Sequence, residues 1–116
     1  DNEVEIITKL DPNNNYEIKS DYREIINNYK PNENTSSPKT TIYEATLIIA
    51  KRKIQLTNGL NPVIEASEYD SIDDIVIKEL KQSVIPFIIK RKIGYKYEYW
   101  KLEDMELDEE IFSVLF

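Results

Sequence analysis

The sequence holds 116 residues with a formal charge of −7, from 22 acidic and 15 basic side chains. That balance disfavours autonomous binding to nucleic acid, because affinity for phosphates rests mainly on lysine and arginine. The absence of cysteine and histidine excludes disulfides, thiolate metal sites and histidine-based catalysis. No apolar run approaches the roughly 20 residues that span a bilayer. We therefore expect a single domain with no metal, no cofactor and no membrane partner.

The first forty residues predict short elements followed by a linker. Val4–Leu10 favours a strand, and the turn-forming residues 11–15, "DPNNN", allow Tyr16–Lys19 to pair back as a hairpin. In residues 21–29, apolar side chains recur at helical spacing, which predicts a two-turn helix. Residues 30–39, "KPNENTSSPK", contain two prolines and nothing apolar to bury, which is typical of a linker.

Residues 42–56 predict a helix with clear ends. Thr41 and Glu44 have the T-x-x-E spacing of a capping box, in which each side chain satisfies a backbone amide of the other. Gly59 is a natural stop for the helix, and Pro62 prevents it from resuming.

The same helix is apolar on two sides. At 100° per residue, one apolar arc comprises Tyr43, Leu47, Ala50 and Ile54. A second arc comprises Ile42, Ala45, Ile48, Ile49 and Leu56, and Arg52 lies inside it. We expect one face to serve the core of the chain and the other to face a partner protein, with Arg52 as the polar element of the partner face.

A second helix is predicted over residues 71–83, with Ser71 or Asp70 as its cap. Its single apolar stripe comprises Ile72, Ile75, Val76 and Leu80. Such a stripe is typical of an ordinary amphipathic helix on a small core.

The last third predicts a hairpin and a docked terminus. Residues 84–91, "VIPFIIKR", favour a strand, Pro86 suits its start or an edge, and Gly94 permits a turn. The returning segment "YKYEYW" alternates, which places Tyr95, Tyr97 and Tyr99 on one face and Lys96, Glu98 and Trp100 on the other. The tail "DEEIFSVLF" is too apolar for a solvated end, so we expect it to dock.

These elements predict an α+β fold with two parts. Residues 1–39 form an irregular N-terminal extension and linker, and residues 40–116 form a domain with a two-helix core followed by a β-hairpin. A two-stranded ribbon is marginal alone in water, so the hairpin must pack on the helices.

Five short motifs in order, over about residues 40–107, resemble one known family. The first helix contributes Thr41, Tyr43, Glu44, Arg52, Gln55 and Leu56. The others are Ile75 with Glu79 and Leu80; Ile85, Pro86, Ile88, Ile89 and Arg91; Tyr97, Glu98 and Trp100; and Glu106 with Leu107. Together they resemble the omega-type small subunit of multisubunit RNA polymerases, the family of bacterial omega, archaeal K and the eukaryotic sixth subunit. "TTIYEAT" is also similar to copies carried by large DNA viruses.

The resemblance implies a non-catalytic subunit in a hetero-oligomer. Such a subunit would clamp the largest subunit of a DNA-directed RNA polymerase and support assembly and stability of the transcribing enzyme. It would meet the other polymerase subunits there, and DNA only through the complex. A viral copy would work in a viral transcription compartment or a virion; the alternative is the nucleus of an AT-rich eukaryote.

The residues expected to bind the partner, by this resemblance, are Tyr43, Glu44, Ile48, Arg52, Gln55, Leu56, Glu79, Pro86, Arg91 and Trp100. Several have a second interpretation. Glu44 also caps its helix, and Arg52 can equally be a surface arginine whose stem lies on apolar residues. Gln55 can simply face solvent, and Pro86 and Trp100 also suit the fold itself. Arg91 can equally protect an edge strand.

The sequence departs from the family pattern at three places. Lys53 stands where a small alanine is usual, and Ile72 where a proline often opens the second helix. The turn between the last two strands is a residue short. These differences concern local packing beside Lys53 and the geometry of the turn.

Two other functions remain open on the residues alone. An acidic adaptor or antitoxin-like interaction module requires only negative charge and a partner surface. A small metal-dependent hydrolase would use the carboxylates of residues 103–109 as oxygen ligands, although that stretch lacks the spacing and central glycine of a calcium loop.

Overall fold

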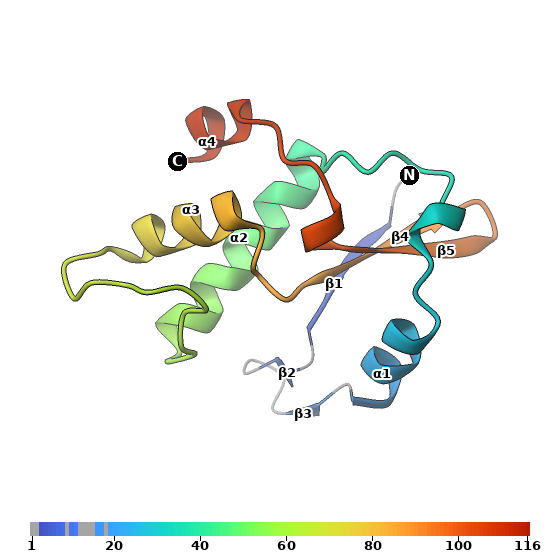
Figure 1. Ribbon diagram of the computed structural model, residues 1–116, viewed down its shortest axis with the longest axis horizontal. Coiled ribbons are helices and arrows are strands. Elements are labelled where there is room, and N and C mark those ends of the chain that lie inside the picture. Colours follow the sequence, from blue (N-terminus) through green and yellow to red (C-terminus); the bar gives the residue numbers. More distant parts are fainter. Residues whose placement is uncertain (1–2, 9, 12–15, 18) are drawn as a thin grey trace.

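The computed structural model describes residues 3–8, 10–11, 16–17 and 19–116, and these combine helices with antiparallel sheet (Figure 1). The helices are α1 (Lys19–Asn27), α2 (Ile42–Thr57), α3 (Ile72–Gln82) and α4 (Glu110–Leu115), with 3-10 turns at Pro31–Glu33 and Leu102–Asp104. The strands are β1 (Val4–Ile7), β2 (Leu10–Asp11), β3 (Tyr16–Glu17), β4 (Ile88–Ile93) and β5 (Lys96–Lys101). The α+β prediction is confirmed. Among these described residues, no helix is both long and apolar enough to cross a membrane.

The main sheet has the antiparallel order β1-β4-β5. Strands β4 and β5 form the predicted hairpin, with Ile93 opposite Lys96. Gly94 begins the two-residue turn with φ of +63°, a conformation that glycine adopts without cost and that suits a tight hairpin. The predicted N-terminal hairpin is confirmed next to its turn, where Leu10 and Asp11 of β2 pair with Glu17 and Tyr16 of β3. It was wrong for Val4–Ile7, because β1 joins the sheet beside β4 instead.

Alternation along β5 follows the prediction. Glu98 and Trp100 are buried, whereas Tyr95 and Tyr97 are exposed. Trp100 lies opposite Ile89 of β4, and both belong to the main core. The inner face of the sheet therefore carries one carboxylate among its apolar side chains.

Both central helices begin at the residues that local chemistry predicts, and α2 also ends where Gly59 predicts. Thr41 and Glu44 form the capping box of α2, and Ser71 with Asp74 forms that of α3. After α2, Gly59 has φ of +97° while its N–H and that of Leu60 bond back to the last turn of the helix. This is the hydrogen-bond pattern of a Schellman motif.

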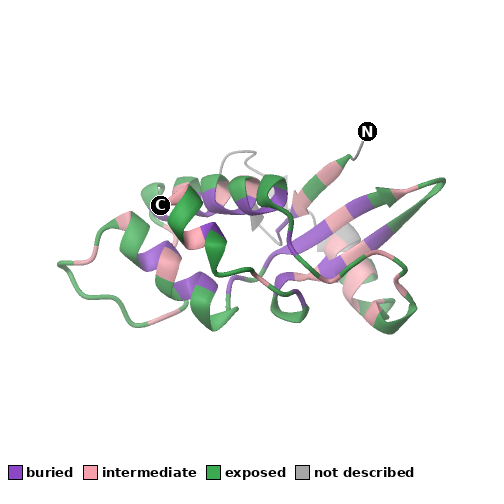
Figure 2. Ribbon diagram, turned by 90° about the horizontal axis from the view of Figure 1, so that it is seen from above, coloured by how far each residue is buried: buried purple, intermediate pink, exposed green. Residues whose placement is uncertain are grey.

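The core lies between α2, α3 and the sheet. Buried positions form stripes along these elements (Figure 2). The cluster comprises Ile48, Ile49, Leu56, Ile75, Val76, Leu80, Ile85, Phe87, Ile89, Trp100, Leu102 and Met105. Ile72, which stands at an expected proline position, is half-buried against this cluster.

The apolar C-terminus docks as predicted. Helix α4 lies beside α2 (Figure 1), with Ile111 only 2 % exposed and Phe116 packed against the core. Lys53 lies at this contact: its Nζ is 5.4 Å from the centre of the Phe116 ring and 2.8 Å from Asp73. A lysine in place of a small residue is accommodated because its stem and charge both find partners.

Candidate partner-binding surface

Arg52 lies inside the molecule. Its side chain is 1 % exposed and binds Glu79 of α3 with two hydrogen bonds, Nε to Oε1 at 2.8 Å and Nη2 to Oε2 at 2.7 Å. Its Nη1 donates to Oε1 of Gln55 at 3.1 Å, and the same Glu79 accepts the backbone N–H of Val63 at 3.0 Å. A polar cluster thus joins α2, α3 and the connection between them within an apolar core.

The two arcs of α2 therefore have the opposite roles to those expected. The arc containing Arg52 faces the core, where Ala45, Ile48 and Ile49 are buried. The other arc faces outward, with Tyr43 59 % and Ile54 45 % exposed. The prediction was wrong because an arginine in an apolar arc fits a partner contact as well as an internal carboxylate, and Glu79 supplies the latter.

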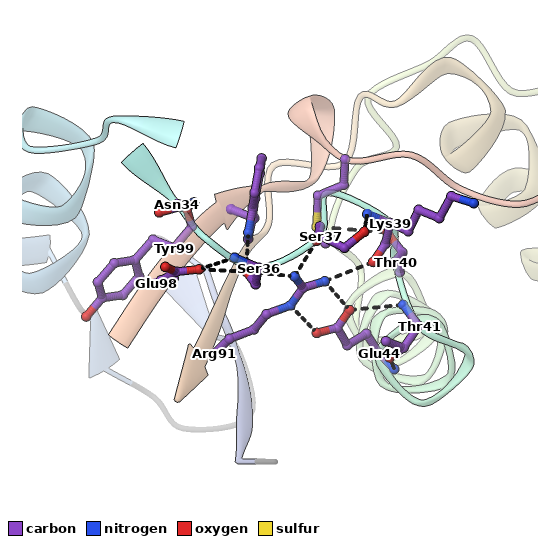
Figure 3. A network of polar contacts seen from close by, with 12 residues as sticks. Asn34, Ser36, Ser37, Lys39, Thr40, Thr41, Glu44, Arg91, Glu98 and Tyr99 are labelled. Atoms are coloured by element: carbon purple, nitrogen blue, oxygen red, sulfur yellow. Dashed lines mark hydrogen bonds and ion pairs between the residues drawn. The ribbon is translucent and has the colours of Figure 1, made fainter. Parts of the chain in front are cut away.

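Arg91 of β4 forms a second internal cluster with Glu44 (Figure 3). Nε and Nη2 donate to the two carboxylate oxygens of Glu44 at 2.7 and 2.8 Å. The remaining donors reach Ser36 Oγ and the backbone carbonyls of Ser37 and Lys39. All five N–H donors of the guanidinium are thereby used. Glu44 also accepts the N–H of Thr41, so it caps α2 and binds the sheet at once.

The segment predicted as a linker is fastened to the sheet. We call residues 34–40 the strap; it runs beside β5 and ends at the start of α2. Ser36 is its central contact, because its hydroxyl donates to Glu98 at 2.7 Å and accepts from Arg91 and from the Trp100 indole N–H (Figure 3). Spacing along the chain could not reveal this role, since every partner lies more than fifty residues away.

Glu98 binds the strap through four hydrogen bonds. The N–H and hydroxyl groups of Thr35 and Ser36 all donate to its carboxylate, at 2.7 to 2.9 Å. Burial acts to raise the pKa of Glu98, but the hydrogen bonds from Ser36 and Thr35 outweigh it and hold the pKa at about 2, below the ordinary 4.5. The carboxylate is therefore charged at neutral pH.

Most of the ten residues expected to bind a partner are internal. Tyr43 and Pro86 are exposed, while the other eight are buried: Glu44, Ile48, Arg52, Gln55, Leu56, Glu79, Arg91 and Trp100. The structure brings Arg52, Gln55 and Glu79 into one cluster, and Arg91 and Glu44 into another. Their direct contact with a partner remains a prediction that this arrangement does not favour.

The outward arc of α2 is an exposed apolar surface on the same helix. It comprises Tyr43, Leu47, Ala50 and Ile54, of which Leu47 is half-buried. Tyr43 also lines a groove of about 530 Å³ with Val4 and Ile93 of the sheet. The motif resemblance named only Tyr43 of this arc and missed Leu47, Ala50 and Ile54, which helical spacing from Tyr43 indicates.

Two carboxylates of residues 103–109 have separate partners. Asp104 accepts a hydrogen bond from Tyr29 at 2.8 Å, and Glu103 lies 3.8 Å from Lys101. The same Tyr29 oxygen accepts the N–H of Lys101. The pKa of Tyr29 is raised, mainly because the hydroxyl is partly buried. In the described part of the chain, no group of three or more acidic side chains is placed to hold a metal ion.

Comparison with known proteins relates the chain to RNA polymerase subunits. "DNA-directed RNA polymerase subunit Rpo6" of Pyrobaculum aerophilum is 36% identical over 58 residues, covering 48% of this chain and 55% of that protein. "DNA-directed RNA polymerase subunit 6" of Acanthamoeba polyphaga mimivirus is 30% identical over 86 residues, covering 73% of this chain but 22% of the viral protein. No protein-family model matches the chain.

A third relative is matched over nearly its whole length. Rpo6 of Methanothermobacter thermautotrophicus is 34% identical over 56 residues, which cover 48% of this chain and 92% of the archaeal subunit. The chain thus spans almost all of one relative, about half of the Pyrobaculum protein and about a fifth of the viral one. These similarities confirm the family indicated by the motifs. The chain belongs to the Rpo6 family of small DNA-directed RNA polymerase subunits, which includes archaeal K and the eukaryotic sixth subunit.

Proposed function

We propose that this chain is a non-catalytic subunit of a DNA-directed RNA polymerase that clamps the largest subunit and supports assembly of the transcribing enzyme. The observation that carries the proposal is the outward arc of α2. Tyr43 and Ile54 stay exposed, whereas Ala45, Ile48, Ile49 and Leu56 on the opposite side of the same helix are buried. Exposed apolar side chains in a row on a rigid element mark a protein interface.

The two internal clusters support this role by keeping the arc rigid. Arg52 and Glu79 hold α2 against α3, and Glu44 and Arg91 hold its first turn against the sheet. A surface that is already ordered loses little conformational entropy when it binds. A domain that binds only the folded form of a large subunit stabilises that form by mass action.

The relatives support the assignment as a polymerase subunit, and the exposed arc of α2 supports the proposed contact with the largest subunit. The matched proteins are named as polymerase subunits, whereas the largest subunit as direct partner is part of our proposal. Other polymerase subunits and DNA would be met only within the complex. The mimivirus relative supports a viral transcription compartment or virion as the place of action, with the nucleus of a eukaryote as the alternative.

Purification of the polymerase from its source tests the proposal. We expect the 116-residue chain to co-purify stoichiometrically with the largest subunit and to cross-link to it through positions on α2. Native mass spectrometry of the purified enzyme gives the stoichiometry. A fully active polymerase that lacks the chain, or a chain cross-linked only to proteins outside the enzyme, would contradict the proposal.

A further inference from the structure

A second apolar groove lies apart from the outward arc of α2. It runs between the first turn of α2, the segment of residues 106–108 and helix α4, and its volume is about 340 Å³. Ile111 forms a buried part of its lining, whereas Ile42 is 56 % and Val114 62 % exposed. Two branched aliphatic side chains thus flank an opening that the described part of the chain leaves uncovered.

The rim of this groove is acidic. Glu106, Asp108 and Glu110 line it together with one basic residue, Lys39. The backbone N–H of Glu110 donates to Asp108 Oδ1 at 3.1 Å, which holds the Asp108 carboxylate at the start of α4. Among the described residues, no lysine or arginine forms an ion pair with Glu106 or Glu110. Both carboxylates are therefore available to a basic partner.

We propose that this groove binds an extended peptide segment of another protein, with one leucine-sized side chain in the groove and lysine or arginine residues on both sides of it. The apolar lining favours burial of an aliphatic anchor, and the three carboxylates favour positive charge beside it. A second copy of this chain is a poor occupant, because each copy carries a net charge of −7. The proposal goes beyond the polymerase clamp, since the groove lies on another side of α2 from Tyr43 and Ile54.

Titration of the full chain with a short peptide tests this inference. The probe is acetyl-Lys-Lys-Leu-Lys-Lys-amide, followed by amide chemical shifts of the isotope-labelled protein. We expect saturable shifts confined to residues 39–42 and 106–114. We also expect weaker binding at higher salt, because the charged pairs at the rim are exposed to solvent.

Matched variants separate the groove from general surface charge. Val114→Lys and Glu110→Lys should each weaken binding by about tenfold or more, since one removes the apolar contact and the other reverses a rim charge. Val84→Lys and Glu68→Lys are controls at exposed positions outside the groove and should leave the affinity unchanged. Far-UV circular dichroism checks that each variant is folded.

Three results would overturn the inference. The first is equal binding of a peptide with serine in place of leucine, which would leave only non-specific charge attraction. The second is equal loss of affinity in the control variants. The third is self-association of the chain that Val114→Lys abolishes, which would make a second copy the occupant. The Val114→Lys chain should still co-purify with the polymerase, because the groove is separate from the outward arc of α2. Loss of the peptide alone would therefore test this inference without testing the clamp proposal.

Discussion

Arg52 of α2 and Glu79 of α3 form an ion pair in the core, with Nε 2.8 Å from Oε1 and Nη2 2.7 Å from Oε2. Both side chains are almost completely shielded from solvent, at 1 % and 0 % exposure. Glu79 also accepts the N–H of Val63, so its carboxylate joins α2, α3 and the connection between them. Removing either Arg52 or Glu79 would leave the other charged group buried without its partner. A charge at this depth is tolerated only while its partner is present.

Replacing Arg52 by alanine should therefore destabilise the fold by about 3–5 kcal/mol, because the Glu79 carboxylate is left buried and unpaired. Urea unfolding followed by far-UV circular dichroism measures the free energy of unfolding. As a matched control, Asp73→Ala removes a half-exposed ion pair with Lys53 and should cost less than about 1 kcal/mol. A loss below about 1 kcal/mol in Arg52→Ala would contradict the assigned burial.

Ser36→Ala should loosen the strap from the sheet. Its hydroxyl satisfies Glu98, Arg91 and the Trp100 indole N–H together. Losing these partners should cost about 1–3 kcal/mol, the range for buried polar groups left without hydrogen bonds. Trp100 is the sole tryptophan, so its fluorescence reports the change and the unfolding transition directly.

Ser37→Ala is the matched control for the strap. Ser37 is exposed, and its contact with Arg91 comes from its backbone carbonyl, which the substitution keeps. Its hydroxyl only accepts the nearby N–H of Lys39, at 3.1 Å. We expect a loss within about 0.5 kcal/mol. Equal effects of Ser36→Ala and Ser37→Ala would argue against Ser36 as the central contact.

The stability of the protein should depend on pH through Glu98. Its pKa is lowered from 4.5 to about 2 in the folded state, despite burial, by hydrogen bonds from Ser36 and Thr35. A lowered pKa means that the unfolded chain takes up a proton first, so the contribution of Glu98 is complete above about pH 5 and falls as the pH drops towards 2. Denaturant unfolding at a series of pH values measures this decline.

Glu98→Gln removes that titration and is the variant for comparison. It should be less stable than the parent at pH 7, and its stability should fall less steeply between about pH 5 and 2. Parallel curves for the two proteins over this range would show that Glu98 does not contribute to the acid sensitivity.

Charge on the outward arc should weaken assembly without unfolding the chain. Tyr43→Asp combined with Ile54→Asp places two carboxylates on an apolar surface that is exposed in the isolated chain. We expect at least a tenfold loss of the largest subunit in co-expression pull-downs, since buried apolar anchors dominate such interfaces. Tyr69→Asp is the control, because Tyr69 is 88 % exposed in the connection between α2 and α3. Equal recovery of the largest subunit with the double variant and with Tyr69→Asp would contradict the proposal that this arc binds it.

Local features of the fold could be predicted because their causes lie close together in the sequence. The capping boxes at Thr41 and Ser71 each involve residues three positions apart. Gly94 marked the hairpin turn, and alternation placed Glu98 and Trp100 on the inner face of β5. In each case a few neighbouring side chains fix the backbone, so few alternatives compete.

The partner of each polar residue could not be predicted in the same way. Residues 34–40 read as a linker because hydroxyl and amide groups give no apolar signal, yet Glu98 and Arg91 bind them from the sheet. Strand β1 likewise formed part of an expected local hairpin but pairs with β4, more than eighty positions away. Contacts of this kind depend on how the whole chain closes.

The sequence by itself determined the capped starts of α2 and α3, the hairpin of β4 and β5, the apolar docking of the C-terminus and, through its motifs, the polymerase subunit family. The bounds of α1 differ from the predicted 21–29, because it spans Lys19–Asn27. Only the tertiary structure decided which arc of α2 faces the core and which remains for a partner. The physical reason is that Arg52 requires a carboxylate wherever it lies, and the one that binds it, Glu79, stands 27 positions further along the chain. Because that pair closes inside the molecule, the arc of Tyr43 and Ile54 faces outward, and it is the surface that we propose for a partner.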